Sequence, residues 1–428
     1  MKLWQKGKKL NKKVDYFTVG DDRIHDLKLA KYDCQASIAH ALMLEKIGLL
    51  SNKELIKIVN VLSELKNQAE DETFMIETNF EDVHSKIEFV LTKRLGDLGK
   101  KIHTARSRND QVLVAMHLYV KDSLDEIKEL TIELFDKLLH LAEIHQEKLL
   151  PGYTHLQIAM PSSFGLWFSA YAEALIDDII FINAAKVIAN QNPLGSAAGY
   201  GSSFPIDREF TTKELGFEFL KINSIAAQMN RGKLEKSTSM ALSLIASTLS
   251  KLSMDICLYM GQDFNFISFP DDLTTGSSIM PHKKNPDIFE LIRGKLNLLQ
   301  DLPNQLTLLT SNLPSGYHRD FQLTKGPLLN GFKELKSCLE MMIYSLPKIR
   351  ISEKIIDQDK YNYLFTVDSL NDEVMNGTPF REAYLKLSQD IESETYIPNK
   401  NVKHTHIGSV GNLSLNLIKE KLKLILLK

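Results

Sequence analysis

A short polar segment at residues 276–286, GSSIMPHKKNP, carries the residue types with the most chemical capacity in this chain. It opens with Gly276, and glycine accepts backbone angles that other residues resist, so the segment can move. A serine hydroxyl beside cations could act as a base if its pKa fell far enough. The two lysines and Asn285 could hold an anionic substrate. A basic surface loop preceding a helix that starts at Asp287 explains the same residues on local grounds.

The segment HTARSRNDQ at residues 103–111 places two arginines, a serine and an asparagine near the start of a predicted long helix. A helix N-terminus favours anions, and arginine can bind a carboxylate through two hydrogen bonds. The segment therefore indicates an anion site. The structural alternative is an N-terminal turn with paired charges.

The segment PGYTHLQIAMP at residues 151–161 places Thr154 and His155 at a break between helices. Histidine titrates near neutrality and suits general acid–base catalysis, although a histidine satisfied at a turn explains this residue equally. Two further segments are weaker by themselves. EDVH at residues 81–84 could open a helix, and YHRDFQLTK at residues 317–325 could bind a polar group or form a solvated loop.

The composition is that of a soluble globular protein. Formal net charge is -2, and 43% of the residues are hydrophobic, so a soluble globular protein with no broad basic field for nucleic acid is expected. The three separated cysteines predict a reducing compartment without disulfides: Cys34, Cys257 and Cys338. No His or Cys pair has zinc spacing, and neither a P-loop nor a GxGxxG segment after a strand is present, so no metal or nucleotide chemistry is expected.

Long stretches without glycine or proline predict an all-α fold. Residues 100–150 contain neither, and their apolar positions recur every three or four residues, which is the helical period. Residues 233–260 form a second such stretch that is apolar nearly all round, as in a helix inside a bundle. We therefore predict three helical domains at residues 1–100, 101–350 and 351–428, the second being a central bundle of long helices. Burying such a helix calls for an oligomer.

Neither the N-terminus nor the most apolar stretch of the chain indicates a membrane protein. The N-terminus is rich in lysine, with no apolar core of signal-peptide length after it, so we expect a solvated arm: Lys2, Lys6, Lys8, Lys9, Lys12 and Lys13. The apolar stretch at residues 164–182 contains Glu173, Asp177 and Asp178, which disfavours a membrane span.

Taken together and in this order, the five segments resemble the fumarase/aspartase superfamily, and within it the argininosuccinate lyase family with its delta-crystallin relatives. Residues 276–286 match every specified position of the superfamily's mobile loop, GSSxMPxKxN. HTARSRNDQ is similar to HTGRSRNDQ, PGYTHLQIAMP to PGYTHLQxAQP, and EDVH to the same four residues of this family. The resemblance runs from about residue 14 to residue 385.

The resemblance implies a homotetramer built on a central bundle of long helices, with each active site assembled from three different subunits. It also implies a cytoplasmic enzyme of arginine biosynthesis. The reaction implied is the reversible anti-elimination of argininosuccinate to fumarate and L-arginine, with no cofactor. The intermediate carries charge into a carboxylate, so a site with cationic and amide donors suits it.

The resemblance also assigns roles to residues. Ser277 resembles the catalytic base, His155 its acid–base partner with Glu290 as charged companion, and Lys283 and Asn285 stabilise the carbanion's carboxylate. Ligands of the succinyl carboxylates are implied at Thr154, Ser107 and Asn109. Contacts to the arginine half are implied at Asp26, Tyr317, Gln322 and Lys325. Supporting roles are implied for Arg108, which pairs with Asp82, for the neighbouring His84, and for Arg208.

The chain departs from the family pattern mainly around the amino-acid half of the site. Asp22 replaces the usual serine four residues before Asp26, and Ala105 replaces a glycine. Where the family has GSGALAG, residues 195–201 read GSAAGYG. Where the family has DAVSxRD, residues 226–232 read AAQMNRG. Further departures are Met160, His318, Leu323 and Thr324. These changes leave the elimination chemistry intact and concern the leaving group.

Two alternatives remain open on the sequence. His282 is reminiscent of the loop of adenylosuccinate lyases, which release fumarate from a different substrate. An inactive structural homologue, as some crystallins are, is the non-enzymatic alternative. The retained Ser277, His155, Lys283 and Glu290 disfavour it.

Overall fold

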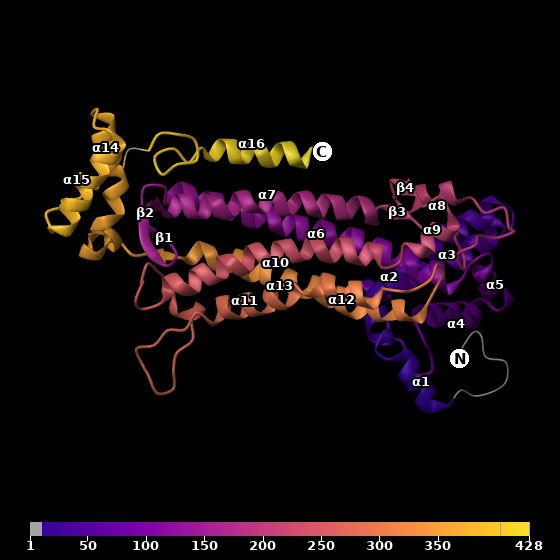
Figure 1. The fold of residues 1–428 in the computed structure, drawn as a ribbon. Helices are drawn as coiled ribbons and strands as arrows, with labels where there is room; N and C mark the ends of the chain where they lie inside the picture. The colour runs from indigo at the N-terminus through magenta and orange to yellow at the C-terminus, as the bar shows by residue number, and fades with distance from the viewer. Residues whose placement is uncertain (1–10, 403, 428) are drawn as a thin grey trace. The chain divides into compact units, whose positions relative to one another are not determined.

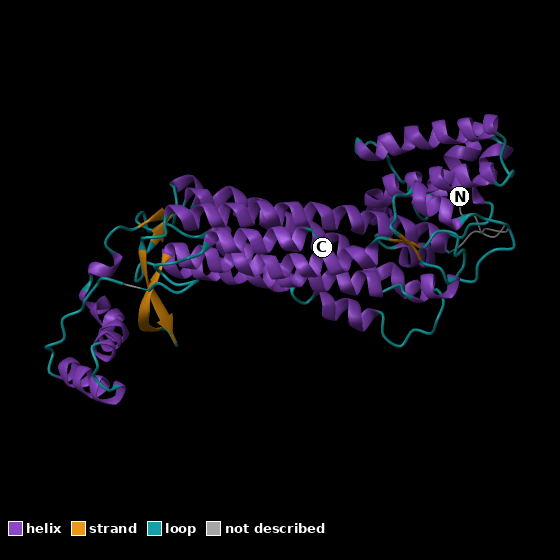
Figure 2. Cartoon of the chain, turned by 90° about the horizontal axis from the view of Figure 1, so that it is seen from above, coloured by secondary structure: helices purple, strands orange, loops and turns teal. Residues whose placement is uncertain are grey.

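The computed structural model describes residues 11–402 and 404–427, and helices make up most of it (Figures 1 and 2). This confirms the all-α prediction. Lys2, Lys6, Lys8 and Lys9 of the expected arm lie outside the described residues, whereas Lys12 and Lys13 begin the exposed helix α1 (Lys12–Val19). The backbone contacts divide the chain into two compact units. Among the described residues, the first contains 11–127, 181–243 and 299–334, and the second contains 128–180, 244–298, 335–402 and 404–427. The three-domain division stays a prediction.

The N-terminal helices of the first unit pack around a core of their own. They are α2 (Asp22–Lys46), α3 (Asn52–Glu70), α4 (Val83–Leu95) and α5 (Asp97–Lys100). Leu44, Ile58 and Leu91 are fully buried where α2, α3 and α4 meet. Helix α3 starts where it does because Ser51 and Glu54 form a reciprocal capping box. The Asp82 side chain caps α4 in a related way, by accepting from the Ser85 amide at 2.8 Å.

The first unit is completed by shorter helices and by parts of four long ones. The shorter elements are α8 (Arg208–Glu214), α9 (Ser224–Met229), α12 (Leu302–Leu309), η3 (Arg319–Thr324) and the parallel pair β3 (Gln191–Asn192) and β4 (Phe219–Leu220). The long helices α6 (Arg108–Ile144), α7 (Phe164–Ala189), α10 (Lys233–Met260) and α13 (Lys325–Ser345) contribute residues to both units.

The two long helices expected from the sequence differ in how well their ends were predicted. Helix α10 has the predicted bounds, 233–260. Helix α6 is shorter than the predicted stretch of residues 100–150, because the chain turns at Ala105, where φ is +60°, and leaves the helix after Ile144. The N-terminal motif therefore lies in a turn, and Arg108 is the first residue of α6.

The second unit contains the other ends of the long helices, with α11 (Asp287–Leu299), two antiparallel strand pairs and the C-terminal helices. The pairs are β1 (Leu149–Thr154) with β2 (Gln157–Ser163) and β5 (Ile267–Ser268) with β6 (Arg350–Ile351). The C-terminal helices are α14 (Thr366–Met375), α15 (Phe380–Glu392) and α16 (Leu415–Leu426). The rings of Trp167 and Phe168 pack at a tilt of 46° with centres 4.7 Å apart, and this aromatic packing extends to Tyr259 and Phe266. Lys421 of α16 pairs with Glu173 of α7 at 2.9 Å.

Among the described residues, α10 is the one helix whose length and hydropathy would suffice to cross a bilayer. Half of its apolar window is buried within the protein, with Leu242, Ile245 and Leu249 fully covered. A buried core helix has the same composition, and α10 packs as one.

Candidate functional site

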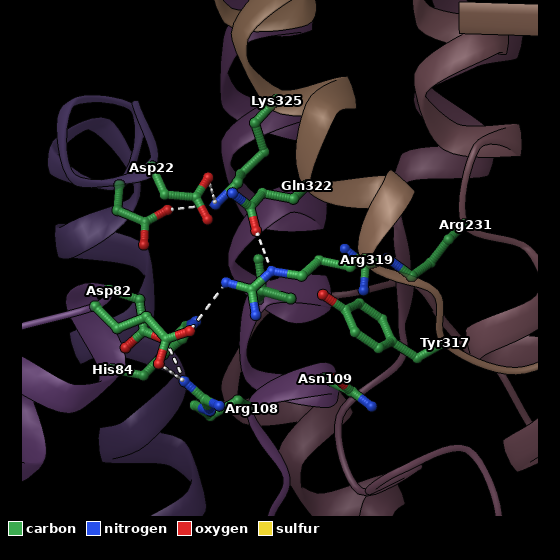
Figure 3. Close-up of a pocket in the computed structure, with 13 residues that line it drawn as sticks. Asp22, Asp82, His84, Arg108, Asn109, Arg231, Tyr317, Arg319, Gln322 and Lys325 are labelled. Carbon is green, nitrogen blue, oxygen red and sulfur yellow. Dashed lines mark hydrogen bonds and ion pairs between the residues drawn. The ribbon is translucent and has the colours of Figure 1, made fainter. Parts of the chain in front are cut away.

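A charged pocket in the first unit collects side chains from five separate stretches of the chain (Figure 3). Its lining comes from α2, the start of α4, the start of α6, the turn before α10, and η3 with the start of α13. The lining residues are Asp22, Asp26, Glu81, Asp82, His84, Arg108, Asn109, Val112, Arg231, Tyr317, Arg319, Gln322 and Lys325. Its volume is about 120 Å³, whereas complete small-molecule sites span roughly 300–1,000 Å³. The pocket therefore has room for part of a substrate.

Lys325 is held between two carboxylates. Its ammonium lies 2.7 Å from Asp22 Oδ1 and 2.8 Å from Asp26 Oδ1, and its side chain is 6% exposed. Burial lowers the pKa of Lys325, but the Asp26 and Asp22 carboxylates outweigh this effect and hold it above its ordinary value. Burial is also the largest influence on Asp22 and raises its pKa to about 6, with Lys325 opposing the rise and Asp26 adding to it. Because Asp22 is buried and shares the single ammonium of Lys325 with Asp26, Asp22 keeps its proton to a higher pH than an ordinary aspartate does.

Arg108 joins the start of α6 to the start of α4. Its Nη1 donates to Asp82 Oδ2 at 2.8 Å and to Glu81 Oε2 at 3.2 Å. Burial raises the pKa of Asp82, but the charges of His84 and Arg108 outweigh it, so the pKa lies below its usual range. The expected pair of Arg108 and Asp82 is thus present, and a carboxylate remains charged at the pocket wall.

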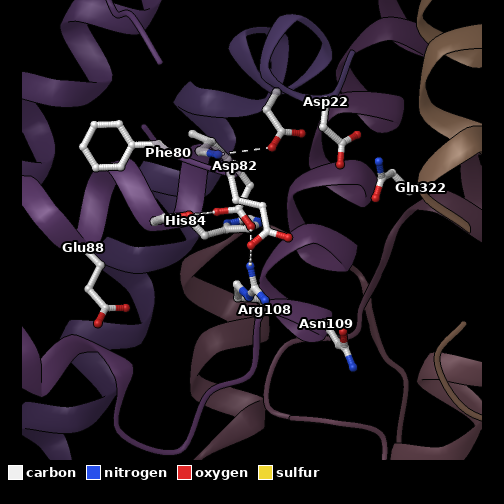
Figure 4. A network of polar contacts seen from close by, with 12 residues as sticks. Asp22, Phe80, Asp82, His84, Glu88, Arg108, Asn109 and Gln322 are labelled. Carbon is white, nitrogen blue, oxygen red and sulfur yellow. Dashed lines mark hydrogen bonds and ion pairs between the residues drawn. The ribbon is translucent and has the colours of Figure 1, made fainter. Parts of the chain in front are cut away.

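A buried polar network adjoins the pocket at His84, which Figure 4 shows beside Asp82 and Arg108. His84 Nδ1 lies 2.9 Å from Asp33 Oδ2, and burial, which lowers the pKa of His84, is outweighed by the Asp33 carboxylate, which raises it. Arg106 donates to Ser37 Oγ at 2.8 Å, and its Nη2 lies 3.9 Å from Asp33 Oδ1. Arg106 thus serves the buried interior, while Arg108 faces the pocket.

The η3 segment presents polar side chains to the pocket from one short stretch. The Arg319 guanidinium donates to Gln322 Oε1 at 3.1 Å and to Glu81 Oε1 at 3.0 Å. Gln322 Nε2 donates to the carbonyl of Thr18 at 3.0 Å, so its amide is fixed against the end of α1. Tyr317 is 38% exposed and lines the same pocket.

Asp110 joins the turn before α6 to the loop at residues 195–201. Its Oδ1 accepts from the Ser107 amide at 3.0 Å, and its Oδ2 accepts from the amides of Gly195 at 3.1 Å and Ala197 at 3.0 Å. Burial raises the pKa of Asp110, against the charge of Arg106 and these three hydrogen bonds. Asp110 therefore holds Ser107 in place, with Asn109 beside it in the pocket wall.

Arg208 has a structural role. Its three guanidinium nitrogens donate to backbone carbonyls, with distances of 2.9 Å to Leu194, 2.9 Å to Ile222 and 2.8 Å to Lys221. It lies outside the lining of the pocket. The arginine thus ties the start of α8 to two segments of the first unit, at residue 194 and at residues 221–222.

Thr154 and His155 lie in the second unit, at the tip of the hairpin formed by β1 and β2. Thr154 pairs with Gln157, so His155 and Leu156 form a two-residue turn with φ values of +54° and +57°. Such a turn normally requires glycine or asparagine. Strained backbone at an exposed histidine is typical of functional sites.

Ser277 lies in a loop of the second unit that is closed at its base. The amide of Asn285 donates to the Thr275 carbonyl at 2.8 Å, and the amide of Thr275 donates back at 3.3 Å. Ser277 Oγ accepts from the amide of Met280 at 3.2 Å. Lys283 is exposed, whereas Lys284 forms an ion pair with Asp271. The loop therefore offers Lys283 to an anion and keeps Lys284 occupied.

Comparison with known proteins identifies the family. Residues 12–298 match the family described as Lyase. The argininosuccinate lyase of Parabacteroides distasonis is 53% identical over 412 residues, which cover 96% of this chain and 92% of that protein. The chain belongs to the argininosuccinate lyase family. The argininosuccinate lyase of Thermotoga neapolitana is 41% identical over 388 residues, which cover 91% of this chain and 98% of that protein. The chain is accordingly an enzyme of the lyase class.

Solved structures confirm the superfamily fold that the argininosuccinate lyase family implies. An EDDS lyase variant with bound fumarate has a TM-score of 0.77 at 19% identity, covering 96% of this chain and 90% of that one. A class II fumarase from Schistosoma mansoni has a TM-score of 0.74 at 17% identity, covering 90% and 91%. At these identities the likeness concerns the fold.

Fourteen of the sixteen site residues expected from the sequence fall into two groups, and the other two, Ser107 and Arg208, lie in the first unit outside the lining of the pocket. Eight line the pocket of the first unit: Asp26, Asp82, His84, Arg108, Asn109, Tyr317, Gln322 and Lys325. Six lie in the second unit: Thr154, His155, Ser277, Lys283, Asn285 and Glu290. Within the described residues, no hydrogen bond links Ser277, His155 and Glu290 to one another. The second group therefore lies on three different elements: the β1–β2 hairpin, the loop at residues 276–285 and the first turn of α11.

Four charged residues of the pocket were absent from the expected argininosuccinate lyase site: Asp22, Glu81, Arg231 and Arg319. Asp22 lies four residues before Asp26 on α2, so helical spacing could have placed it on the same face. Glu81 and Arg319 lie within two residues of expected site members. Arg231 matches the arginine of the family segment DAVSxRD at residues 226–232, but its place beside Tyr317 is set by the fold. Among the described residues, no group of acidic, His or Cys side chains could hold a metal ion.

Proposed function

We propose that the protein catalyses the reversible elimination of argininosuccinate to fumarate and L-arginine, in the cytoplasm, as a step of arginine biosynthesis. The observation that carries this proposal is the 53% identity to an argininosuccinate lyase over 96% of the chain. The pocket supports it chemically, because its cations and carboxylates suit a substrate that bears both signs of charge.

In this proposal Ser277 removes a proton from Cβ of the succinyl part. The electrons form the double bond of fumarate as the bond from carbon to the guanidino nitrogen breaks, and the leaving nitrogen takes up a proton. Lys283 and Asn285 hold the carboxylate into which the negative charge spreads. His155, with Glu290 as its charged companion, takes part in the proton transfers. The exposed Lys283 and the open tip of the loop suit this role.

The residues of the first unit bind the rest of the substrate in this proposal. Ser107, Asn109 and Thr154 hold the succinyl carboxylates. Asp26, Tyr317, Gln322 and Lys325 contact the arginine half, while Arg108 and Asp82 shape the site beside His84. The small volume of the pocket supports a site that further residues complete.

We propose further that the enzyme is a homotetramer in which three subunits contribute to each active site. Exposed apolar side chains on α11 support this, since Leu291 and Leu298 are 63% and 77% exposed and lie seven residues apart on one helix face. A subunit interface would cover such a stripe.

The experiment that tests the function supplies the purified protein with argininosuccinate and, separately, with adenylosuccinate. Fumarate is followed by ultraviolet absorbance, and the second product by chromatography. We expect fumarate and arginine in equal amounts from argininosuccinate alone. Turnover of adenylosuccinate alone would support the related lyase, and turnover of neither substrate would support an inactive structural homologue.

A further inference from the structure

The four cations that line the pocket differ in how their charge is balanced. Arg108 pairs with Asp82, Arg319 pairs with Glu81, and Lys325 pairs with two aspartates. Arg231 is the exception, because it forms no ion pair among the residues that the structure describes. Its positive charge is therefore available to a ligand.

Arg231 is nevertheless buried. The residue is 7% exposed, and its Nη1 has no hydrogen-bond partner in the described part of the chain. The guanidinium carbon lies 4.9 Å from the ring centre of Tyr317 and 5.1 Å from that of Phe321, and the side chain runs toward Tyr317 at the pocket (Figure 3). Burial lowers the pKa of Arg231, although the Tyr317 hydroxyl and Glu235 oppose this effect.

The nearest acidic residue in the sequence does not neutralise this charge. Glu235 is 2% exposed, and its Oε2 accepts from the Gly232 amide at 2.7 Å. It therefore fixes the turn that presents Arg231. Arg208 offers a useful contrast, since all three of its guanidinium nitrogens donate to backbone carbonyls. Arg208 is bonded as a structural arginine, whereas Arg231 keeps a donor unused at the pocket wall.

An arginine that is buried with an unused donor is costly unless an anion reaches it. A carboxylate suits it best, because the planar guanidinium can give two parallel hydrogen bonds to the two carboxylate oxygens. Argininosuccinate has three carboxylates. Two belong to the succinyl part, for which the proposed function already assigns donors. The third is the α-carboxylate of the arginine half, whose proposed contact Tyr317 packs against Arg231.

We infer that Arg231 binds the α-carboxylate of the arginine half and so makes the enzyme selective for an α-amino acid as its leaving group. This inference rests on the proposed function. Asp22 lines the same pocket, 2.7 Å from Lys325, and supplies negative charge for the α-ammonium of the same group. In this inference, the departures from the family pattern at residues 22 and 226–232 change how the amino-acid head group is bound. The leaving group is still an amino acid.

The test uses the reverse reaction, in which fumarate combines with an amine. Arginine and agmatine, which is arginine without its carboxylate, are compared as substrates of the wild-type enzyme and of Arg231→Gln. We expect wild type to prefer arginine by at least roughly a hundredfold in kcat/KM, because losing one partner leaves a buried charge unpaired. In Arg231→Gln we expect the preference to fall to a fewfold, through a higher KM for arginine. Arg94→Gln, which removes an exposed arginine of α4 that pairs with Glu64, should keep the wild-type preference.

The outcomes separate this inference from the proposed function. If wild type makes argininosuccinate but uses agmatine as well as arginine, the inference is overturned and the function stands. The same holds if Arg231→Gln is active and keeps the full preference. If Arg231→Gln does not fold, Arg231→Lys decides: it retains the charge but loses the paired hydrogen bonds, so an unchanged preference in that variant overturns the inference. Failure of wild type with argininosuccinate in both directions refutes the function itself.

Discussion

Two alanines have the left-handed backbone that glycine accepts without strain. Ala105 has φ of +60° and Ala197 has φ of +52°, and the family pattern has glycine at both positions. The two residues meet through Asp110, which accepts from the Ala197 amide and holds the turn that follows Ala105. The strain is thus stored at the start of α6, where the pocket residues Arg108 and Asn109 begin.

Replacing either alanine by glycine should stabilise the protein. A left-handed alanine costs about 1–2 kcal/mol, part of which the greater freedom of glycine in the unfolded chain offsets. We expect Ala105→Gly and Ala197→Gly each to raise the free energy of unfolding by about 1 kcal/mol in urea titrations. Ala184→Gly, at an exposed position of α7, is the matched control and should lower it by about 1 kcal/mol. Destabilisation by all three variants would contradict the strain.

Asp22 should make stability depend on pH. Burial raises its pKa in the folded protein to about 6 from an ordinary value of 3.8. The folded protein therefore holds this proton more tightly than the unfolded chain does, so the contribution of Asp22 to stability is present below pH 3.8 and is lost as pH rises through about 6.

The variant Asp22→Asn removes this titration and keeps an oxygen that can accept from Lys325. Between pH 4, just above the ordinary pKa of 3.8, and pH 7, above the folded-state pKa of about 6, the wild type should lose on the order of 2–3 kcal/mol of unfolding free energy relative to the variant. Urea titrations across the range measure this difference. As a control, Asp136→Asn at an exposed position should show the same pH dependence of stability as the wild type. If the stability of Asp22→Asn changed with pH in parallel with that of the wild type, Asp22 would not be the titrating group.

Much of the site could be predicted at the residue scale, because its motifs are contiguous. The motifs that contain Asp82, Arg108 and Lys325 could be recognised in the sequence, and the structure brings these residues together in one pocket. The role inferred for Arg231 was not predicted, because the lack of an ion pair to its guanidinium, among the residues that the structure describes, is visible only in three dimensions.

At the scale of elements, long helices were predictable and short strands were not. Helix α10 has the expected ends because 28 residues without glycine or proline leave the helix uninterrupted. The hairpin of β1 and β2 was missed, since its turn contains His155 and Leu156 where glycine or asparagine is usual. The end of α6 at Ile144 was also missed, because no proline or glycine marks it.

The loop at residues 276–285 should carry the chemistry without supporting the fold. Its base is held by the Thr275–Asn285 backbone pair, and Ser277 Oγ accepts only weak local bonds, at 3.2 Å from Met280 and 3.4 Å from Ile279. Ser277→Ala should therefore lower kcat for argininosuccinate by several powers of ten and leave the melting temperature and the assembly unchanged. Ser278→Ala is the matched control and should stay active. Near-normal turnover in Ser277→Ala would refute its assignment as the base.

At the scale of the whole molecule, the pocket and the catalytic loop belong to different compact units. The proposed tetramer brings them together by letting different subunits supply them. The exposed leucines of α11 support such an assembly, and so does the small volume of the pocket. Assembly could be expected from sequence through the apolar α10, but which residues meet across subunits could not, because one chain's sequence carries no direct record of intersubunit contacts.

The most direct test of this account measures argininosuccinate cleavage by mixed subunits. Two variants are co-expressed with different tags, and the mixed tetramers are purified through both tags. Ser277→Ala lacks the base, and Asn109→Asp places a negative charge where the succinyl carboxylate binds. Each variant alone should be nearly inactive. Because different subunits supply the two residues, some sites of the mixed tetramers would be intact, and we predict activity far above that of either variant. Mixed tetramers as inactive as the separate variants would contradict the account.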